Sequence, residues 1–373
     1  MTRRNFFQVS AGGAITLPEF QPKSMLHVAA HPATSAKFPV IDVHTHLFGT
    51  GRRAAPDSPE GAAELSSVAQ CMDECNLQTL INLTGGISGT IPAIRRVMTP
   101  FGGKFLTAAE PTWARANEMG YAQWQAEDLA KCKQEGAVGL KILKTLGLGL
   151  RENGKLVSID DPRFDPMWEA AGSLELPVLI HTGDPGAFFT PIDRFNERYE
   201  ELQHHPEWSF YGRDFPPRSE LHEARNRVAA RHPKTRFIYL HVGNDAEDLA
   251  QVSDWLDRYT NVNVEFGARL GELGRQPRTA RKFFDRYQDR IMFGTDATFN
   301  AGKEFPQQDL VPPMYRCYFR FLETEDEYFD YAPSAVPPQG RWKIYGIALP
   351  DAILRKVYHN NAAREFKLKA VFG

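Results

Sequence analysis

The sequence has 373 residues, of which 42% are hydrophobic and 24% are charged, as is usual for a globular protein. Its formal net charge of −2 argues against a nucleic-acid partner, because no basic excess is available to hold phosphates. No apolar run approaches the roughly 20 residues that a membrane-spanning helix needs. The length fits either two average domains or one large α/β barrel.

Residues 1–36 are expected to lie outside the fold. The segment begins "MTRRNFF", where Arg3 and Arg4 are followed by two phenylalanines and then by a Gly/Ala-rich stretch. This order is similar to a bacterial twin-arginine export signal, and "VAAH" offers a cleavage site after Ala30. The apolar stretch is short and contains Pro18, so a disordered cytosolic leader stays an alternative. The chain is thus expected either in the periplasm or in the cytoplasm.

From residue 37 onward, short β-type runs alternate with helical patterns. Strands are predicted at residues 38–46, 77–86, 104–113, 137–147, 176–184, 235–244, 261–269 and 290–298. Helices are predicted at residues 64–76, 91–98, 121–136, 163–175, 219–233, 246–259, 279–289 and 350–366. This alternation implies parallel strands and right-handed crossovers, and eight strands close a (β/α)8 TIM barrel. No Gly-, Pro- or Ser-rich linker divides the sequence, so we expect a single barrel domain over residues 37–373.

The first strand ends in a His-x-His pair, His44 and His46. Because side chains alternate along a strand, both imidazoles should point one way, and Val43 and Thr45 the other. More polar residues stand where later apolar runs stop, namely His181 in the fifth strand, His241 in the sixth and Asp296 in the eighth. The carboxyl ends of barrel strands meet at one mouth, where catalytic groups lie. We therefore expect these side chains to share one site.

Neutral imidazoles and a carboxylate are typical ligands of zinc and similar divalent metals. Three or four such ligands leave a position open for water, whose pKa the metal lowers toward neutrality. A histidine that titrates near pH 7 can then take the proton of that water. The sequence thus predicts a divalent cofactor, expected to be Zn2+, with one ion per chain or two.

With these residues in place, the sequence resembles the amidohydrolase superfamily. The phrases "IDVHTHLFG", "LPVLIHTGDP", "LHVGN", "RIMFGTDA" and "YGIALPDAILRKVYHNNAAR" are similar to those of the amidohydrolase-related group that includes aminocarboxymuconate-semialdehyde decarboxylase. The resemblance implies metal binding by His44, His46, His181 and Asp296. It also implies that His241 activates the water or polarises the substrate, with Asp296 sharing the proton handling. Some decarboxylases of the group carry Glu-x-Ala in the first strand, whereas this sequence keeps His-x-His.

The resemblance also points to the fourth strand, where superfamily members with two metals carry a carboxylated bridging lysine. The sequence offers two candidates there, Lys144 nearer the end of the strand and Lys141 in the more usual Gly-x-Lys phrase. Arg269 after the seventh strand, and Arg52 with its neighbour Arg53 after the first, are candidates for holding a substrate carboxylate. The alternative for each arginine is a surface salt bridge.

Two reactions fit this site. The leading interpretation is a metal-dependent hydrolase, in which metal-activated water attacks an ester, lactone or amide carbonyl. The alternative is a non-oxidative decarboxylase of an aromatic or unsaturated carboxylic acid, which needs the same metal, the same histidine and a carboxylate-binding arginine. A non-catalytic binding barrel would lack a ligand, and none is missing. The expected partner is a small-molecule substrate, and two aromatic-rich loops, 185–217 and 299–336, are expected to form a lid, a pocket wall or a homo-oligomer interface.

Overall fold

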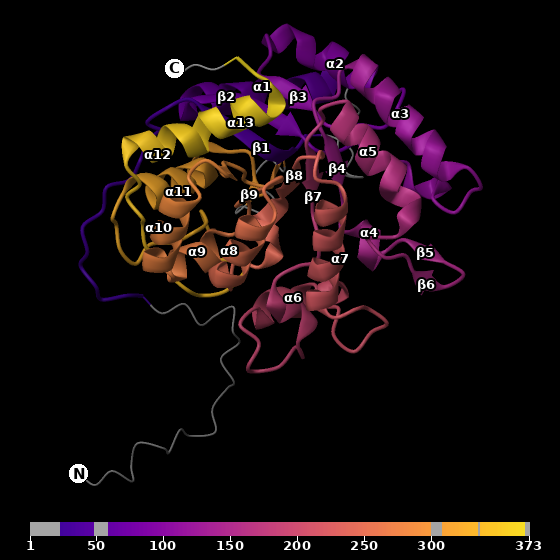
Figure 1. Ribbon diagram of the computed structural model, residues 1–373. Coiled ribbons are helices and arrows are strands. Elements are labelled where there is room, and N and C mark those ends of the chain that lie inside the picture. Colours follow the sequence, from indigo (N-terminus) through magenta and orange to yellow (C-terminus); the bar gives the residue numbers. More distant parts are fainter. Residues whose placement is uncertain (1–22, 48–58, 300–307, 335, 370–373) are drawn as a thin grey trace.

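The apolar runs of the sequence form short parallel strands in the computed structural model, which describes residues 23–47, 59–299, 308–334 and 336–369 (Figure 1). In chain order the barrel strands are β1 (Val40–His46), β2 (Leu77–Asn82), β3 (Phe105–Thr107), β4 (Leu140–Ile142), β7 (Val178–Ile180), β8 (Phe237–Tyr239), β9 (Val262–Glu265), β10 (Ile291–Met292) and β11 (Ala297–Thr298). The pair β5 (Arg151–Glu152) and β6 (Lys155–Leu156) forms a separate antiparallel hairpin.

Hydrogen bonding arranges the strands in two parallel series, β11-β1-β2-β3 and β10-β9-β8-β7-β4. A bridge between Ala109 and Leu140 joins the end of the first series to β4. The strands β10 and β11 are two pieces of the single stretch that the sequence predicts as strand eight. Because β10 pairs with β9 and β11 pairs with β1, this stretch closes the ring. The prediction of a single-domain (β/α)8 barrel is confirmed.

Helices cover the outside of the ring. They are α1 (Pro59–Cys75), α2 (Ile91–Met98), α3 (Tyr121–Glu135), α4 (Thr145–Leu148), α5 (Asp165–Ser173), α6 (Tyr199–His204), α7 (Arg218–Arg231), α8 (Leu249–Arg258), α9 (Leu270–Arg275), α10 (Pro277–Arg286), α11 (Pro312–Glu323), α12 (Asp351–Arg355) and α13 (Asn361–Phe366). The helix predicted at 350–366 is interrupted by a π-helical turn, Lys356–Asn360, between α12 and α13. Helices α4, α6, α9 and α11 are absent from the sequence-based prediction.

The aromatic residues of α11 fill the core of the barrel wall. The Tyr315 and Phe319 side chains are fully buried, and their ring centroids lie 6.5 and 6.2 Å from that of Phe293, which follows β10. Aromatic rings at these distances pack favourably against one another. These two rings of α11 therefore belong to the core, and the expectation of a lid, a pocket wall or an oligomer interface for residues 299–336 stays a prediction.

Side chains that face the barrel interior form an apolar cluster with the last helix. The cluster contains Ile41, Val43, Ile81, Leu83, Ala108, Leu179, Ile238, Leu240, Met292, Ala362, Ala363 and Phe366. Phe366 of α13 approaches Gly139, just before β4, where an added Cβ would come within 3.4 Å of the ring. Helix α13 thus covers the amino-terminal end of the barrel, and the carboxyl ends of the strands are left for polar side chains.

Strand β1 does not alternate regularly. It shifts register against β2 between Asp42 and Thr45, and the Asp42 carboxylate accepts a hydrogen bond from the backbone N–H of His44 (3.1 Å). A bulge of this kind re-aims the side chains that follow it. Val43 belongs to the interior cluster, and His44 also reaches interior partners. The prediction that Val43 points away from His44 is therefore wrong, because a period of two fails at a bulge.

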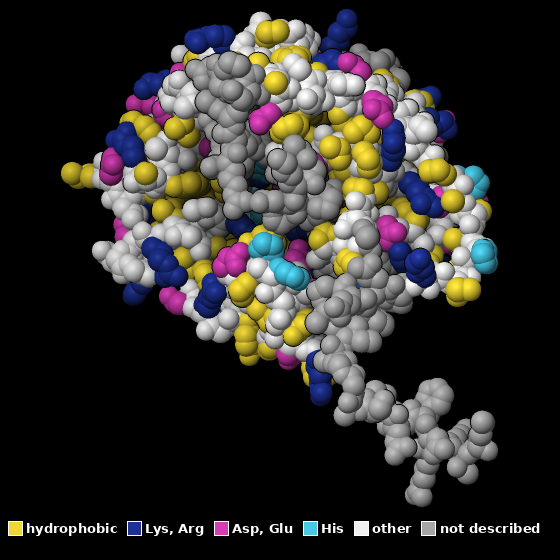
Figure 2. All heavy atoms as spheres, turned by 180° about the vertical axis from the view of Figure 1, so that it is seen from behind, with side chains coloured by type: hydrophobic (Ala, Val, Ile, Leu, Met, Phe, Trp, Pro, Cys, Tyr) yellow, Lys and Arg dark blue, Asp and Glu magenta, His cyan; other side chains and the backbone are white. Residues whose placement is uncertain are grey.

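Acidic and basic side chains are interspersed on the face seen in Figure 2, and neither sign forms a continuous region there. This mixture accords with the net charge of −2. Among the helices of the described residues, none is both long and apolar enough to cross a membrane.

Candidate functional site

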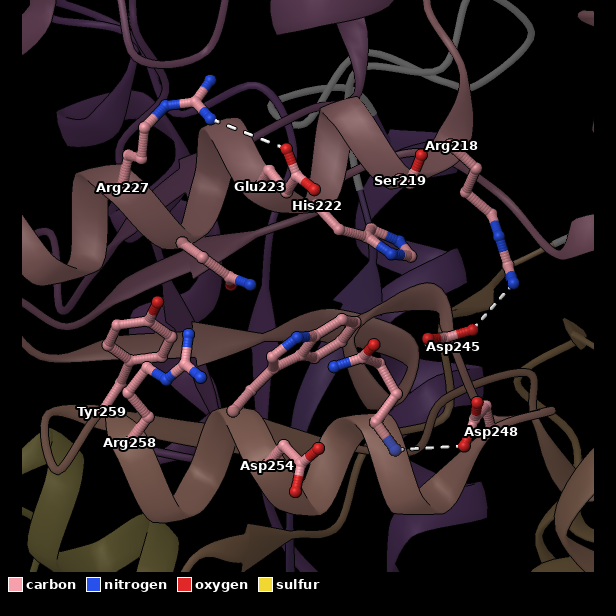
Figure 3. Close-up of a pocket in the computed structure, with 13 residues that line it drawn as sticks. Arg218, Ser219, His222, Glu223, Arg227, Asp245, Asp248, Asp254, Arg258 and Tyr259 are labelled. Atoms are coloured by element: carbon pink, nitrogen blue, oxygen red, sulfur yellow. Dashed lines mark hydrogen bonds and ion pairs between the residues drawn. The ribbon is translucent and has the colours of Figure 1, made fainter.

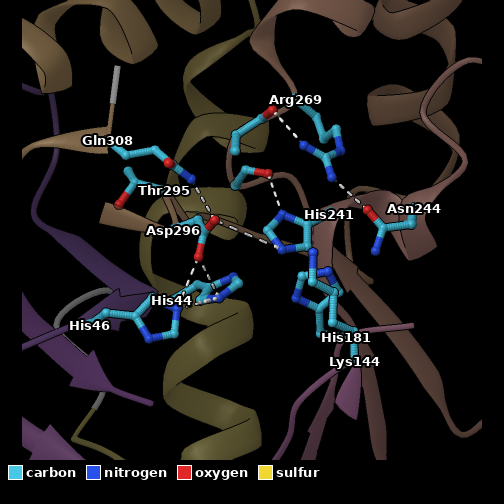
Figure 4. A network of polar contacts seen from close by, with 12 residues as sticks. His44, His46, Lys144, His181, His241, Asn244, Arg269, Thr295, Asp296 and Gln308 are labelled. Carbon is cyan, nitrogen blue, oxygen red and sulfur yellow. Dashed lines mark hydrogen bonds and ion pairs between the residues drawn. The ribbon is translucent and has the colours of Figure 1, made fainter. Parts of the chain in front are cut away.

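Three potential metal ligands converge at the mouth of the barrel (Figure 4). Asp296 Oδ1 lies 3.0 Å from His44 Nε2 and 2.9 Å from His46 Nε2, and the two imidazole nitrogens are 3.2 Å apart. The His44 side chain is fully buried, whereas 12% of His46 and 18% of Asp296 is exposed. The structure thus brings together one carboxylate and two imidazoles from opposite ends of the barrel sequence, and the group keeps access to solvent.

The spacing of these donor atoms fits a small divalent cation. In tetrahedral coordination with bonds of about 2.0–2.1 Å, neighbouring ligand atoms are roughly 3.3 Å apart. The three distances in the group, 2.9, 3.0 and 3.2 Å, are close to this value. Nitrogen and oxygen donors of this type suit zinc and its neighbours better than calcium or magnesium, which prefer oxygen ligands.

Two further histidines lie beside the group. The ring centroid of His241 is 4.9 Å from that of His44 and 4.5 Å from that of His181. The Nδ1 atom of His241 is 2.7 Å from the carbonyl oxygen of Gly267, a contact that requires a proton on Nδ1. The Nε2 atom is then an acceptor, and it is buried without a hydrogen-bond partner among the described residues, 4.0 Å from Asp296 Oδ2.

His181 is placed differently from the other predicted ligands. Its Nε2 atom lies 3.1 Å from the carbonyl oxygen of Gly183 and 3.6 Å from Asp184 Oδ1. It is not one of the three residues whose donor atoms converge within 4.8 Å around Asp296. Its role as a metal ligand stays a prediction.

Glu265, at the end of β9, is an important residue of the site that sequence reasoning missed. Its carboxylate accepts hydrogen bonds from His44 Nδ1 (3.0 Å) and from the backbone N–H groups of His241 (2.6 Å) and Gly267 (2.5 Å). A carboxylate on Nδ1 orients a ligating imidazole and leaves its Nε2 for the metal. A Cβ at Gly267 would come within 2.8 Å of Glu265 Oε2, and one at Gly294 closer still, so both positions require glycine. The available signal was a lone charge in the predicted strand "NVNVEF".

The backbone is strained at two of the functional positions. His241, Val242 and Asn244 have φ angles of 59°, 56° and 55°, and Asp296 has a φ angle of 62°. Each left-handed non-glycine residue costs of order 1–3 kcal/mol, and such residues cluster where function demands a particular side-chain direction. Leu240 faces the barrel interior, so regular alternation would point the next side chain, that of His241, outward. The turn Leu240–Asn244 directs His241 back toward the site.

The structure distinguishes the two lysines of the fourth strand. Lys141 in β4 is completely buried, and its Nζ atom lies 3.2 Å from His44 Nε2. Lys144 lies beyond β4, is 40% exposed and pairs with Asp184 at 2.6 Å. Of the two candidates, Lys141 is therefore the one that reaches the histidine–aspartate group. The proximity of Lys144 to the end of the strand was misleading, because β4 ends at Ile142.

Arg269 lies close to His241, and 95% of its surface is buried (5% exposed). It donates hydrogen bonds to the carbonyl oxygen of Ala268 (2.8 Å) and to Asn244 Oδ1 (2.5 Å). Its Nε atom is buried without a hydrogen-bond partner among the described residues. Arg269 is thus a guanidinium with a free donor beside the site, whereas Arg52 and Arg53 lie outside the described residues.

Protonation states at the mouth suit a divalent cation. Burial lowers the pKa of His46 to about 4. Burial alone would raise the pKa of Asp296, but the neighbouring His44 and His241 hold it well below its usual value. His44 differs: burial and Lys141 lower its pKa, yet Asp296 and Glu265 raise it above 6.5. A cation bound at the Nε2 atom would favour the neutral form of His44.

The remaining groups are also biased toward their neutral forms by burial. Burial lowers the pKa of His181 to about 4 and that of Lys141 to about 8. The pKa of His241 lies well below 6.5, because burial and then the charge of Arg269 disfavour the imidazolium. His46, His181 and His241 are therefore biased toward the neutral form, next to an ionised carboxylate and an amine whose pKa is lowered.

A separate cleft of about 640 Å³ lies between α7 and α8, away from these residues (Figure 3). Its walls carry acidic and basic side chains, among them Arg218 and Asp245, which form an ion pair at 2.8 Å. His222 on its inner wall is buried, and its ring centroid is 5.0 Å from that of Trp255. No metal-type cluster of His, Cys, Asp and Glu is present here among the described residues. The cleft is therefore a weaker candidate for chemistry than the barrel mouth.

Comparison with known proteins places this chain in a family. The model of the amidohydrolase family described as "Amidohydrolase" matches residues 105–368, more than half of the chain. The match includes His181, His241 and Asp296, whereas His44 and His46 precede it. A search of curated proteins finds no match.

Solved structures share the barrel at low sequence identity. A 2,6-dihydroxybenzoate decarboxylase from Rhizobium is 16% identical, with a TM-score of 0.53, over 88% of this chain and 99% of that one. A dihydroorotase from Campylobacter jejuni is 13% identical, with a TM-score of 0.51, over 92% and 88%. An uncharacterised TIM-barrel protein from Bordetella bronchiseptica is 13% identical, with a TM-score of 0.52, over 88% and 99%. At these identities the likeness establishes the fold alone.

Proposed function

The chain belongs to the amidohydrolase family, and from this premise we propose that it is a metal-dependent hydrolase of an ester, lactone or amide. The observation that carries the proposal is the convergence of His44, His46 and Asp296 within hydrogen-bonding distance of one another, beside the unpaired Nε2 atom of His241. When bound there, a divalent cation, proposed to be Zn2+, supplies Lewis acidity and lowers the pKa of a water molecule.

The protein residues then divide the remaining tasks. Glu265 fixes the ring of His44 through Nδ1, so that its Nε2 atom faces the site. His241 is held through Nδ1 by the carbonyl oxygen of Gly267, which leaves Nε2 to accept a proton from the attacking water and to return it to the leaving group. Asp296 Oδ2 lies 4.0 Å from this nitrogen and stabilises the imidazolium form.

The proposed substrate carries a carboxylate. Arg269 is buried beside His241 with a free Nε donor, and a guanidinium in such a place pairs well with a carboxylate. Because Asn244 and the Ala268 carbonyl hold the side chain, it needs little ordering when the substrate binds. Arg269 would hold the acid group while the scissile carbonyl faces His241.

The same arginine supports the second candidate, decarboxylation of an aromatic or unsaturated acid. A carboxylate that is itself the leaving group would also need a cation and a proton donor close together. Lys141 favours hydrolysis, because its Nζ atom, with a pKa near 8, contacts His44 where a lysine of the binuclear superfamily members would bridge two metals. We therefore place hydrolysis first.

An oxygen-18 experiment separates the two reactions. Zinc-loaded protein is incubated in H2(18)O with a panel of carboxylate-bearing aryl esters, lactones and amides, and in parallel with aromatic acids. A hydrolase introduces one 18O atom into the product acid, whereas a decarboxylase releases carbon dioxide from an acid substrate. Protein treated with a chelator is the control and should regain activity with Zn2+. Carbon dioxide release without 18O incorporation would contradict hydrolysis, and inactivity of fully loaded protein toward both panels would contradict the whole proposal.

A further inference from the structure

We propose that the chain is cut between Ala30 and His31, and that the buried carboxylate of Asp326 then holds the new α-ammonium group of His31. The cut itself is a peptide hydrolysis by an export-linked peptidase of the host. Water adds across the Ala30–His31 bond, its hydroxyl going to the Ala30 carbonyl carbon and its hydrogen to the His31 nitrogen.

The contacts of the N-terminal segment change at this bond. Residues 23–30 are all exposed, form no helix or strand, and make one hydrogen bond among the described residues, from the Leu26 N–H to Ser24 Oγ. Residues 31–36 are attached to the barrel: Arg316 donates to the Thr34 carbonyl oxygen (3.1 Å), and the Ala36 N–H donates to the Cys75 carbonyl oxygen (3.2 Å). The segment runs along the outside of the molecule in Figure 1, between the N-terminal trace and β1.

His31 is the first anchored residue, and its anchor is the side chain of Asp326. The His31 backbone nitrogen lies 2.6 Å from Asp326 Oδ2, and its Nδ1 atom lies 2.7 Å from Asp326 Oδ1. Only 1% of the Asp326 side chain is exposed, whereas 70% of the His31 side chain is. A buried carboxylate thus takes two hydrogen bonds from one surface residue 295 positions earlier in the sequence.

The backbone nitrogen that contacts Asp326 is the atom that becomes an amine on cleavage. A neutral N–H···O⁻ contact would turn into an ion pair between an ammonium and a carboxylate, and such charge-assisted bonds are shorter and stronger. Burial would raise the pKa of Asp326, but its hydrogen bonds with His31 and its pairing with Arg320 at 2.7 Å keep it lowered. The carboxylate is therefore ionised at neutral pH and ready for a second cation.

The sequence around the bond suits a peptidase. The residues before it are Val28, Ala29 and Ala30, and small residues of this kind precede the cleavage site of export signals. Val28 and Ala29 line an open groove of about 1190 Å³ beside the start of α10, and both residues are exposed. The twin-arginine motif at Arg3 and Arg4, which would direct export, lies outside the described residues.

The first test is the mass of the exported protein. The full chain is produced in a bacterium that has a twin-arginine pathway, beside an Arg3→Lys, Arg4→Lys double variant, and the periplasmic and cytoplasmic fractions are analysed by intact mass. We expect a periplasmic protein that begins at His31, and an uncut cytoplasmic protein from the double variant. A wild-type chain that stays uncut, or one that is cut at another bond, overturns the proposed site.

The second test addresses the Asp326 contact. Two otherwise identical chains are prepared by cleavage of a fusion, one that begins at His31 and one that begins at Ala30, and the pKa of each α-amino group is measured by NMR after selective labelling. A free α-amino group titrates near about 7.7–8.0. We expect the His31 chain to titrate at least about one pH unit higher than the Ala30 chain, a tenfold change in the proton equilibrium.

The other charged groups near this position are present in both chains and affect both α-amino pKa measurements. They are the His31 imidazole, Arg320, and the groove residues Arg275, Arg278, Arg281, Lys282, Glu325 and Glu327. Asp326→Asn in the His31 chain should abolish the difference between the two chains. Because that variant also loses the pairing with Arg320, the comparison of the two unsubstituted chains decides the matter: equal α-amino pKa values would overturn the ion pair.

Discussion

Two buried histidines, His241 at the barrel mouth and His222 in the cleft between α7 and α8, look alike by several criteria. They are 1% and 5% exposed, and the Nε2 atom of each lacks a hydrogen-bond partner among the described residues. Burial holds both pKa values well below 6.5, and nearby arginines add to the effect. A perturbed pKa in a cleft is often taken as a sign of catalysis. By that sign the two residues would be equivalent.

Their surroundings separate them. His241 faces His44, His181 and Asp296 and sits on left-handed backbone, whereas His222 occupies a regular position in α7 against the indole of Trp255. A low pKa reports burial, and burial is common to cores and active sites. Convergence of several donor atoms, together with left-handed backbone at His241, distinguishes the mouth from the cleft. Each prediction below tests this difference.

The largest effect is expected for His44→Ala. Substitution of a residue that only contacts a metal ligand costs roughly 10–100-fold in metal affinity. Loss of an imidazole from the group of three should cost more than this and should abolish activity. Metal content per chain, measured by elemental analysis, should fall from about one ion to nearly none. His222→Leu is the matched control and should keep its metal. Retention of metal by the His44 variant would mean that the mouth is not the metal site.

The next effect is expected for His241→Ala. If Nε2 of His241 transfers a proton, kcat should fall by about 10²–10⁴-fold. Metal content should stay unchanged for a single ion, and the His222→Leu variant should keep its kcat. A variant that loses part of its metal would instead identify His241 as a ligand of a second ion, and an unchanged kcat would remove it from the proposed mechanism.

A smaller effect is expected for Glu265→Gln. The amide cannot accept from His44 Nδ1 and from two backbone N–H groups as strongly as the carboxylate does, so metal affinity should fall by roughly 10–100-fold. Competition with a chelator of known affinity measures this change. Glu118→Gln, which removes an exposed carboxylate paired with Arg115, is the control and should leave affinity unaltered. Equal affinities for both variants would contradict the role given to Glu265.

The smallest effect concerns the pH dependence of stability through His222. The unfolded residue titrates near about 6.5, and the folded residue at a lower pH, so between these values only the unfolded state holds the proton. The contribution of His222 to the free energy of unfolding is therefore fully present above about pH 6.5. It decreases as the pH falls below this value, by at most about 1.4 kcal/mol per pH unit. Denaturation of His222→Leu with urea at pH 5.0 and 7.0 should show a smaller difference between the two values than wild type. An identical difference would mean that protonation of His222 does not contribute to the pH dependence of stability.

Much of the barrel and part of its site could be predicted from the sequence. Alternating apolar runs and helical patterns are local properties, so they indicated eight parallel strands in order. The positions of His46, His181 and Asp296 at the carboxyl ends followed from where each run stops. His44 and His46 could be grouped with Asp296 because barrel closure brings the first and last strands together.

The tertiary structure decided which residues surround that group. Glu265 contacts His44 across 221 positions of sequence, and Lys141 rather than Lys144 reaches the same imidazole. The bulge held by Asp42 turns His44 inward, and the left-handed turn does the same for His241, both against the period of two. Such contacts depend on how distant strands meet and on backbone conformations that only the packed barrel stabilises. Periodicity carries no information about either. For that reason the sequence by itself determined the ring of strands, whereas the tertiary structure decided which side chains meet at the site.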